Sequence, residues 1–459
     1  MRRQTVSLFM LSILFSCFVS TASLQTDIST KQNDNAPSAA AHNSSSVGNA
    51  FTVNDTTPPL VLTFAGDLMA HTVNFNMNEY DLIYKAVEKI LHSDDLSFVN
   101  IETPVCDALP LSTYPCFNVH TPYLRAAVQA GFDMLGFANN HTNDHGTTGI
   151  DGTLTSVRTV QKERLAADVL PPFLAFSGLK DSVTDSIQVT PLSYKGWNIL
   201  FCSVTEILNS YDSSKNRLYY SAPTKQGRAA LLAIIKEARN RYPCDLFVLG
   251  LHLNEPEYGR TVSNAKKAWF KQLGEAGIDI IWAHHPHVMQ SWETITVERT
   301  VVLQGASKAN STTDQTTSGT DKAIAGHTGI SDMKEAAVSE QCKVFCMYSM
   351  GNFISGQRWH TRYDDPAFYR EYTGDAVMLQ LTCTRNKAGR ADFSVLPLLI
   401  TQYNEPEYPV VKRFTQEWIE TLGEKEKKYF KISQKNAIII RYDNFLKKGE
   451  RKKENENNI

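Results

Sequence analysis

The sequence predicts an α/β fold with a largely parallel sheet and a second, mixed sheet. Between residues 60 and 288, short apolar runs rich in β-branched residues alternate with helical patterns, which is the rhythm of βαβ units. Polar residues directly follow several of these runs, as they do where parallel strands end. Three later apolar runs follow one another without helices between them, and we assign these to the second sheet.

Each element is predicted from a local pattern. The early strands are short apolar runs at Leu60–Ala65, Leu96–Ile101, Phe132–Ala138, Asp245–Leu251 and Ile278–Ala283. Helices are expected at Thr224–Arg241 and Ser263–Ala276, and another begins with Thr121 as N-cap before the first-turn residue Pro122. The later strands are Val344–Ser349, Ala376–Thr382 and Phe393–Ile400.

The composition is that of a globular protein. The chain has 459 residues, of which 42% are hydrophobic and 20% are charged, so it can bury the core of one large domain or of two smaller ones. The formal net charge is only -2. Such a small charge gives no electrostatic reason to expect nucleic acid or an anionic membrane surface as a partner.

The first 22 residues have the three parts of a secretory signal. Met1-Arg2-Arg3 is followed by the apolar run Val6–Val19 and then by the small residues Ser20-Thr21-Ala22, so we expect a signal peptide at 1–22 and an exported protein of the periplasm or cell envelope. The alternative is a lipoprotein signal. Leu14-Phe15-Ser16-Cys17 resembles a bacterial lipobox, and lipidation of Cys17 would anchor the protein to a membrane.

The rest of the chain divides by composition. Residues 23–59 contain almost no apolar side chains and are expected to be a disordered linker, because they cannot offset their own ordering entropy. The folded domain is predicted at 60–410. It carries an inserted polar loop at 305–331, and 411–459 form a C-terminal helix and a charged tail.

Seven of the eight cysteines lie beyond Ala22, so an oxidising compartment could pair some of them. Cys106 with Cys116 is the favoured bridge. The alternative is that the thiols are reduced core residues, which we expect for Cys202 and Cys383 because both lie within apolar strands.

Good divalent-metal ligands recur at the ends of the predicted strands. They are Asp67, Glu102, Asn140, His252, His285 and His287. The carboxyl ends of parallel strands converge on one crevice, so these side chains are expected to meet and to hold a metal ion. Each also has an ordinary structural explanation as a turn residue, a salt-bridge partner or a core histidine. Around Ala283, the run His284-His285-Pro286-His287 is the densest part of the pattern, and its alternative is a group of surface histidines.

Five motifs together resemble the CapA family of poly-γ-glutamate capsule biosynthesis proteins, which looks like a branch of the calcineurin-like metallophosphoesterases. The motifs are Ala65-Gly-Asp-Leu-Met69, Asn100-Ile-Glu-Thr-Pro104, Ala138-Asn-Asn-His-Thr-Asn-Asp-His-Gly146, Ala283-His-His-Pro-His-Val-Met-Gln290 and Tyr348-Ser-Met-Gly-Asn-Phe353. The strand into His252 belongs to the same set. The resemblance implies a metallophosphatase-like four-layer αββα double sheet from about Leu60 to about Ile400.

The resemblance also implies roles for single residues. The six strand-end residues match the metal ligands, and His141 matches the histidine that protonates a leaving group. Asp144 is expected to form a hydrogen bond with His141 and to fix its tautomer, and the alternative is that Asp144 caps a helix. Asn352 is a candidate substrate contact, and the alternative is that it is a turn residue. This chain departs from the metallophosphoesterase pattern at Met69, where a histidine ligand is expected, and at Glu102, where the bridging ligand is an aspartate.

Two functions follow from the resemblance. One is a CapA-like envelope protein that binds a polyanion such as poly-γ-glutamate and serves its biosynthesis, export or anchoring, together with envelope polymer-synthesis proteins. The other is an exported metal-dependent hydrolase acting on a phosphoester. Both require one or two divalent ions, and mixed oxygen and nitrogen ligands favour Mn, Fe or Zn over Mg or Ca. Loss of the ligand at Met69 favours binding, whereas His141 beside Asn140 favours catalysis.

Overall fold

The computed structural model describes residues 57–167, 169–302 and 337–438. The predicted signal peptide 1–22, the lipidation site Cys17, nearly all of the linker 23–59 and the inserted loop 305–331 lie outside the described residues. Among the described residues, no helix combines the length and the apolar character needed to cross a bilayer.

The first sheet has eight strands, and the strand β1 lies at its centre. Its order is β14-β13-β12-β1-β2-β3-β4, and β11 also pairs with β1. Strands β1 to β4 and β11 run parallel, whereas β12, β13 and β14 are antiparallel. The bounds are β1 Leu60–Leu68, β2 Leu96–Ile101, β3 Met134–Gly136, β4 Ala175–Ser177, β11 Asn352–Ile354, β12 Asp375–Arg385, β13 Ala391–Asn404 and β14 Pro409–Arg413.

The second sheet has six strands in the order β5-β6-β7-β8-β10-β9. The inner strands β6, β7, β8 and β10 are parallel, and the edge strands β5 and β9 are antiparallel to their neighbours. The bounds are β5 Thr190–Tyr194, β6 Trp197–Thr205, β7 Leu246–His252, β8 Ile280–His284, β9 Trp292–Val302 and β10 Ala337–Met347.

Two helix ends illustrate recognisable signals. Thr224 caps α5 by accepting a hydrogen bond from the backbone N–H of Gly227, and Gly277 ends α6 with φ 133°, a conformation that favours glycine. The bounds of the α-helices are α1 Thr72–Phe75, α2 Glu88–Leu91, α3 Thr121–Gln129, α4 Gly146–Ala166, α5 Lys225–Arg241, α6 Asn264–Ala276 and α7 Gln416–Glu420. Short 3-10 segments are η1 Tyr80–Ile83, η2 Ser213–Arg217 and η3 Glu371–Gly374, and a last helical stretch covers 424–438.

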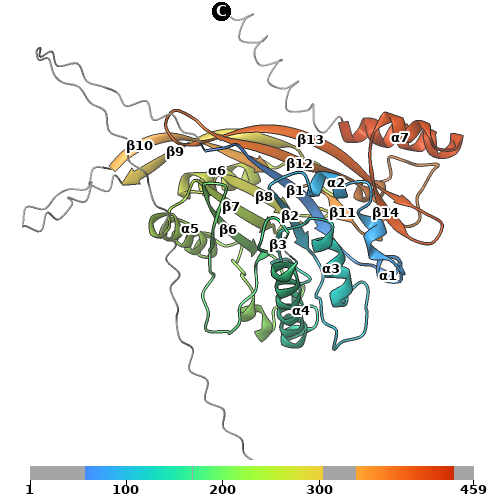
Figure 1. The fold of residues 1–459 in the computed structure, drawn as a ribbon, viewed down its shortest axis with the longest axis horizontal. Coiled ribbons are helices and arrows are strands. Elements are labelled where there is room, and N and C mark those ends of the chain that lie inside the picture. Colours follow the sequence, from blue (N-terminus) through green and yellow to red (C-terminus); the bar gives the residue numbers. More distant parts are fainter. Residues whose placement is uncertain (1–56, 168, 303–336, 439–459) are drawn as a thin grey trace, which may run out of the picture. The chain divides into compact units, whose positions relative to one another are not determined.

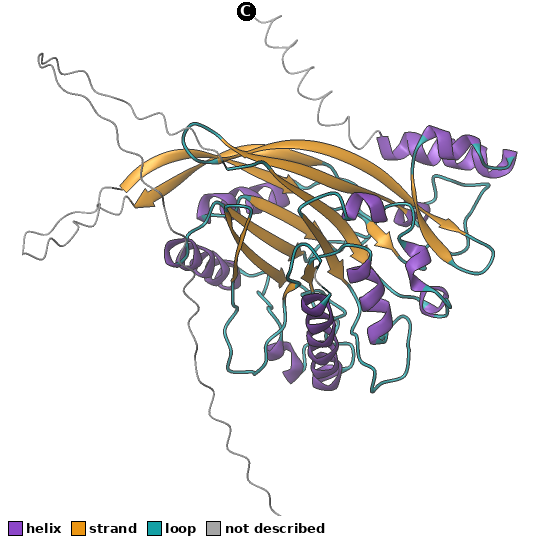
Figure 2. Cartoon of the chain, in the orientation of Figure 1, coloured by secondary structure: helices purple, strands orange, loops and turns teal. Residues whose placement is uncertain are grey.

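The two sheets pack face to face between two helical layers (Figures 1 and 2). One apolar cluster lies between the sheets and joins Phe64 and Phe98 of the first to Phe201 and Trp282 of the second. A second cluster lies between the first sheet and α3 and α4, and a third packs α5 and α6 on the second sheet. The predicted four-layer αββα fold is therefore confirmed.

The assignment of strands to sheets differs from the prediction. The early parallel strands are divided between the two sheets, and the late strands β12 and β13 extend the first sheet in the antiparallel direction. An apolar run is compatible with a place in either sheet, so the pattern identified the strands without identifying their neighbours. One helix also begins differently: Thr121 is the first residue of α3 rather than its cap, because Asp107 binds both its N–H and its hydroxyl.

The chain after β13 belongs to the same core. Strand β14 spans residue 410, and the helical stretch 424–438 packs its aromatic side chains on the sheet. Arg358, fully buried, donates to Asp375 and Thr401 at 2.7 and 2.6 Å, and Ser433 binds the other oxygen of the same aspartate.

The described cysteines are all free thiols. The favoured bridge between Cys106 and Cys116 is not formed. Cys106 is buried with its Sγ 3.8 Å from Thr148 O, and Cys116 is exposed. Cys202 and Cys383 are buried reduced residues, as expected.

Candidate metal centre

The predicted ligands lie at the carboxyl ends of strands from both sheets. Asp67 is the penultimate residue of β1, and Glu102 directly follows β2, its neighbour in the first sheet. In the second sheet, His252 ends β7 and pairs in register with His284, which ends β8. The crevice between these strand ends therefore brings together residues that lie far apart in the chain.

Asp67, Glu102 and His252 form the tightest group. Each offers one ligand atom, and these atoms all lie within 4.8 Å of one another in a fully buried position. His252 Nε2 lies 3.6 Å from Glu102 Oε1. The ring of His287 joins the group, with Nδ1 3.5 Å from Asp67 Oδ2 and Nε2 3.8 Å from Glu102 Oε1. This cluster could hold a metal ion.

Two more histidines lie beside this group, His284 at the end of β8 and His285 in the loop after it. His285 Nδ1 lies 3.2 Å from His252 Nε2, and His284 Nδ1 lies 2.7 Å from Asp67 Oδ1, although the His284 ring is not aligned for a hydrogen bond. His285 and His287 have φ of 101° and 57°. Left-handed backbone at a residue other than glycine costs about 1–3 kcal/mol and is found preferentially at functional sites.

Asn100 determines which carboxylate oxygens face the cluster. Its Nδ2 donates to Asp67 Oδ1 at 2.8 Å and lies 3.4 Å from Glu102 Oε2. The other oxygen of each carboxylate, Asp67 Oδ2 and Glu102 Oε1, is buried without a hydrogen-bond partner. An unpartnered buried carboxylate oxygen is costly unless a cation compensates it, so the donor set fits a divalent ion.

Burial and the charges within the cluster shift the pKa values of its members. Burial alone would raise the pKa of Asp67, but His284 and His287 outweigh it and hold that pKa well below its usual value. Burial and the nearby Asp67 raise the pKa of Glu102. Burial also lowers the pKa of His252 and brings that of His285 to about 3, so both imidazoles are neutral at neutral pH and keep a lone pair for a metal.

Asn140, the sixth predicted ligand, is oriented by a residue that the sequence did not single out. Its Nδ2 donates to Asn209 Oδ1 at 3.1 Å, which leaves Asn140 Oδ1 buried and without a hydrogen-bond partner. Asn209 lies in the loop after β6. Its contact fixes the direction of the Asn140 amide and presents the oxygen, the ligand atom that a divalent cation prefers.

We expect Asn209→Ala to weaken metal affinity by roughly ten- to a hundredfold, because the Asn140 amide would lose the contact that orients its oxygen. Metal titration of the purified variant measures this. Asn216→Ala is the matched control, since Asn216 is an exposed residue nearby in the chain. Equal affinity in both variants would contradict the orienting role of Asn209.

His141 and Asp144 are in contact as predicted. His141 Nδ1 lies 2.8 Å from Asp144 Oδ2, which also accepts a hydrogen bond from the backbone N–H of Phe117 at 2.8 Å. An ionised carboxylate can only accept, so this contact places a proton on Nδ1 and leaves Nε2 to accept or donate the second. Asn209 Nδ2 lies 3.1 Å from the same Nδ1, so one loop contacts both Asn140 and His141.

Asn352 lies behind His287. Its Oδ1 is 3.0 Å from His287 Nδ1, and its Nδ2 contacts Ser355, Gln357 and Thr373. The amide predicted as a substrate contact therefore already has protein partners at both ends. Its contact with Nδ1 turns His287 Nε2 toward Glu102.

Met69 stands where a histidine ligand was expected, and another histidine follows two residues later. Met69 is buried and contributes backbone hydrogen bonds to Ile354 and Tyr123. His71, two residues on, accepts the backbone N–H of Gly356 on its Nδ1 at 3.0 Å. Burial, with the nearby His287 and His141, lowers its pKa to about 4. Accepting on Nδ1 leaves Nε2–H of the neutral ring as a donor.

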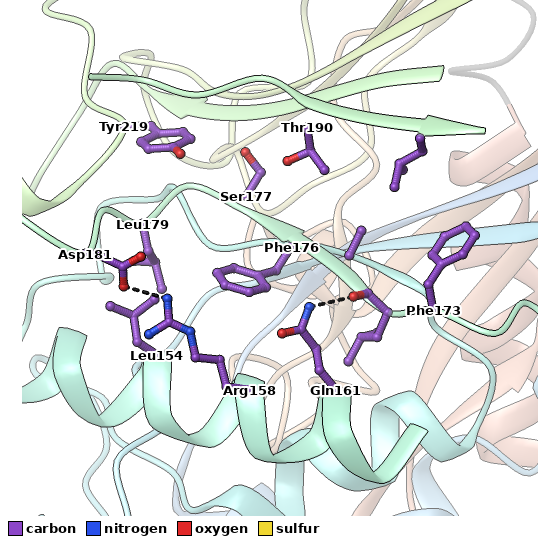
Figure 3. Close-up of a pocket in the computed structure, with 13 residues that line it drawn as sticks. Leu154, Arg158, Gln161, Phe173, Phe176, Ser177, Leu179, Asp181, Thr190 and Tyr219 are labelled. Carbon is purple, nitrogen blue, oxygen red and sulfur yellow. Dashed lines mark hydrogen bonds and ion pairs between the residues drawn. The ribbon is translucent and has the colours of Figure 1, made fainter. Parts of the chain in front are cut away.

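A separate cavity of about 360 Å³ lies between α4, β4 and β5 (Figure 3). Two of its polar side chains already have protein partners: Arg158 contacts Asp181, and Gln161 donates to Leu174 O at 2.6 Å. None of the strand-end residues lines this cavity. We therefore assign the chemistry to the strand ends and not to this cavity.

Comparisons with known proteins agree with the geometry. Residues 61–357 match the family model described as "Bacterial capsule synthesis protein PGA_cap". The chain is 26% identical over 244 residues to the capsule biosynthesis protein CapA of Bacillus anthracis and 25% identical over 241 residues to the PGA biosynthesis protein CapA of Bacillus subtilis (strain 168). Each match covers 51% of this chain, and it spans 56% and 59% of the length of those two relatives.

A crystal structure of a hypothetical protein from Thermus thermophilus aligns with a TM-score of 0.36 and 13% identity, covering 76% of this chain and 100% of that one. The family match covers well over half of the chain and contains every strand end described above. The chain belongs to the family of bacterial capsule synthesis proteins PGA_cap, to which CapA belongs.

Proposed function

We propose that this protein serves capsule biosynthesis by binding poly-γ-glutamate, or a closely related polyanion, at a divalent-metal centre. One observation carries the proposal: Asn100 occupies one oxygen of Asp67 and approaches one of Glu102, so the other oxygen of each faces the histidines of the cluster without a hydrogen-bond partner. The Bacillus subtilis relative is a PGA biosynthesis protein, and this supports the choice of polymer.

The residues that would hold the ion are Asp67, Glu102, Asn140, His252, His285 and His287. This mixture of oxygen and nitrogen donors suits Mn, Fe or Zn. When bound, such an ion polarises a carbonyl or phosphoryl oxygen and attracts an anionic group. The protein's own part is to hold Asp67 and Glu102 close together in a buried position, so that a bound ion would offset their charge and the loaded site would attract an anion more strongly than the empty site.

A second function, hydrolysis of a phosphoester or of the polymer itself, is favoured by the His141–Asp144 pair. Asp144 holds the proton of His141 on Nδ1, so Nε2 can pass a proton to a leaving oxygen or nitrogen. The pair lies beside the ligand Asn140, as an acid acting on a metal-bound group requires.

Two measurements test the proposal. The metal content of the protein purified without chelator should reach at least one ion per chain, and the loaded protein should bind poly-γ-glutamate while the chelated protein does not. Equal binding with and without metal would contradict the proposed role of the centre. Turnover of the polymer and of a chromogenic phosphodiester, measured in parallel, separates a binding centre from a hydrolase.

Export is part of the proposal and rests on the sequence of residues 1–22. Detergent partitioning of the mature protein compared with a Cys17→Ala variant distinguishes a lipid-anchored form from a free one. Full-length chain that keeps Met1 in the cytosol would contradict export.

A further inference from the structure

Tyr258 stands at the rim of the metal centre on a strained backbone. Its φ is 62°, and its N–H donates to Pro286 O at 2.8 Å, so it is tied to the loop between His285 and His287. Its half-buried ring lies 6.4 Å from the ring of His287, centroid to centroid. A bulky residue held in the left-handed region costs free energy, which points to a function for its position.

Arg370 approaches the same place from another part of the chain. Its guanidinium lies 5.6 Å from the centre of the Tyr258 ring, and the ring of Tyr369 lies 5.5 Å from that of Tyr258. Burial is the main cause of the low pKa of His71, and Arg370 contributes to it as His287 and His141 do. Arg370 and Tyr369 are both exposed. We call Tyr258, Tyr369 and Arg370 the rim cluster.

The segment that carries Arg370 is anchored to the metal centre. Thr373 donates through its N–H and its hydroxyl to Arg370 O at 3.1 and 2.6 Å, and Thr373 O accepts from Asn352 Nδ2 at 3.1 Å. Asn352 in turn contacts His287. Tyr258 is thus tied directly, and Arg370 through Thr373 and Asn352, to the loop that bears the histidine ligands. Such anchoring is what a preorganised binding group needs.

The charge of Arg370 is not neutralised by an ion pair. Among the described residues, none of the ion pairs involves Arg370, whereas the exposed Arg362 of the same segment lies 3.9 Å from Asp365. Glu257 is an exposed carboxylate near enough to influence Tyr258 and Arg370. A planar guanidinium stacked on an aromatic ring presents its edge for paired hydrogen bonds to a carboxylate.

We propose that the rim cluster is a subsite for a carboxylate of an anionic chain whose neighbouring unit lies at the metal centre. This inference rests on the proposed function, because it assigns the substrate class of the same site. Arg370 supplies the charge and the hydrogen bonds, Tyr258 and Tyr369 hold the guanidinium in place, and the metal centre holds the adjoining unit. The protein would thereby prefer a chain of closely spaced carboxylates over a neutral chain with the same backbone.

The test uses the metal-loaded full chain and three probes. These are a γ-linked glutamate decamer, the uncharged γ-linked glutamine decamer and inorganic triphosphate, and calorimetry measures binding. Arg370→Gln should weaken binding of the glutamate decamer by roughly three- to tenfold, leave the glutamine decamer unchanged and leave metal content unchanged. Arg370→Lys should give an intermediate affinity, because the positive charge stays while the paired N–H donors of the planar guanidinium and its stacking on the ring are lost.

Arg362→Gln is the matched control. Arg362 is also exposed and stacked, 4.3 Å from the Phe368 ring centre, but it already has Asp365 as a partner. Glu257→Gln should strengthen binding of the glutamate decamer by about twofold, since it removes a repelling charge. The same affinity for the glutamate decamer in Arg370→Gln and Arg362→Gln would overturn the subsite.

The two proposals fail in distinguishable ways. If the wild-type protein does not bind the glutamate decamer, the proposed polymer is wrong, and triphosphate then decides the subsite. Weaker triphosphate binding in Arg370→Gln than in Arg362→Gln would support an anion subsite at the rim. Equal triphosphate binding, or no binding of either anion by the wild-type protein, would overturn it.

Discussion

The double variant His285→Ala with His287→Ala should lose bound transition metal almost completely, with affinity reduced by at least roughly a hundredfold. His287 lies 3.5 Å and 3.8 Å from the two carboxylates, and His285 lies 3.2 Å from His252, so the variant removes two of the imidazoles around the group. Metal analysis after gel filtration measures the loss.

The fold should survive this change. Both residues lie in the loop after β8, while the apolar part of that strand, Ile280–Ala283, stays untouched. Alanine also carries a Cβ, so the left-handed backbone at these two positions stays about as costly as it is with histidine. We therefore expect the metal-free variant to melt within a few degrees of the metal-free wild-type protein. The control is His92→Ala with His360→Ala, which removes two exposed histidines elsewhere and should keep the metal. Full metal occupancy in the His285/His287 variant would remove the basis of the proposed centre.

His141→Ala should leave metal content nearly unchanged and slow any hydrolysis by roughly a hundred- to ten-thousandfold. The ring of His141 packs on Phe117 and is held by Asp144, and no contact joins it to the carboxylate pair among the described hydrogen bonds and ion pairs. It can therefore donate a proton without binding the ion. Steady-state turnover, with metal content determined on the same sample, measures both effects.

His145→Ala is the matched control for this experiment. His145 lies four residues further along the same segment and contacts Ser112 Oγ at 3.2 Å. Its removal should leave turnover within about twofold of the wild-type rate, as expected away from the reacting groups. If His141→Ala turns over as fast as the control, the crevice is a polymer-binding centre without an acid catalyst.

The sequence was sufficient to predict the layers of the fold and the place where its polar residues meet. The end of a strand can be predicted because a buried apolar run such as Ile280–Ala283 stops abruptly at histidines. Parallel strands then bring such ends together at one edge of the sheet. The helix α4 was not predicted. It contains Gly146, Gly149 and Gly152 among several threonines, residues of low helix propensity, and tertiary packing against the first sheet overrides that preference.

The asparagines that orient the ligands were not predicted either. The sequence presents Asn100 only as the start of a motif, yet it binds Asp67 and approaches Glu102, and Asn209 belongs to none of the motifs. In the sequence, an asparagine near a strand end is most simply interpreted as a turn residue. Its partner can be identified only when the fold brings distant segments of the chain together. His71 lacked a recognisable motif because its spacing from Asp67 is not that of the expected histidine.

The indole of Trp282 gives this protein a built-in optical reporter. Fully buried between the sheets, it donates to Ala65 O at 2.8 Å, two residues before Asp67, and its ring lies 4.3 Å from that of His284, edge to face. We expect an ion bound at the strand ends to alter the field around His284 and therefore the emission of this indole, which is one of 6 in the chain. Subtracting the spectrum of a Trp282→Phe variant isolates that signal, so occupancy of the crevice can be followed in real time without a dye or a label.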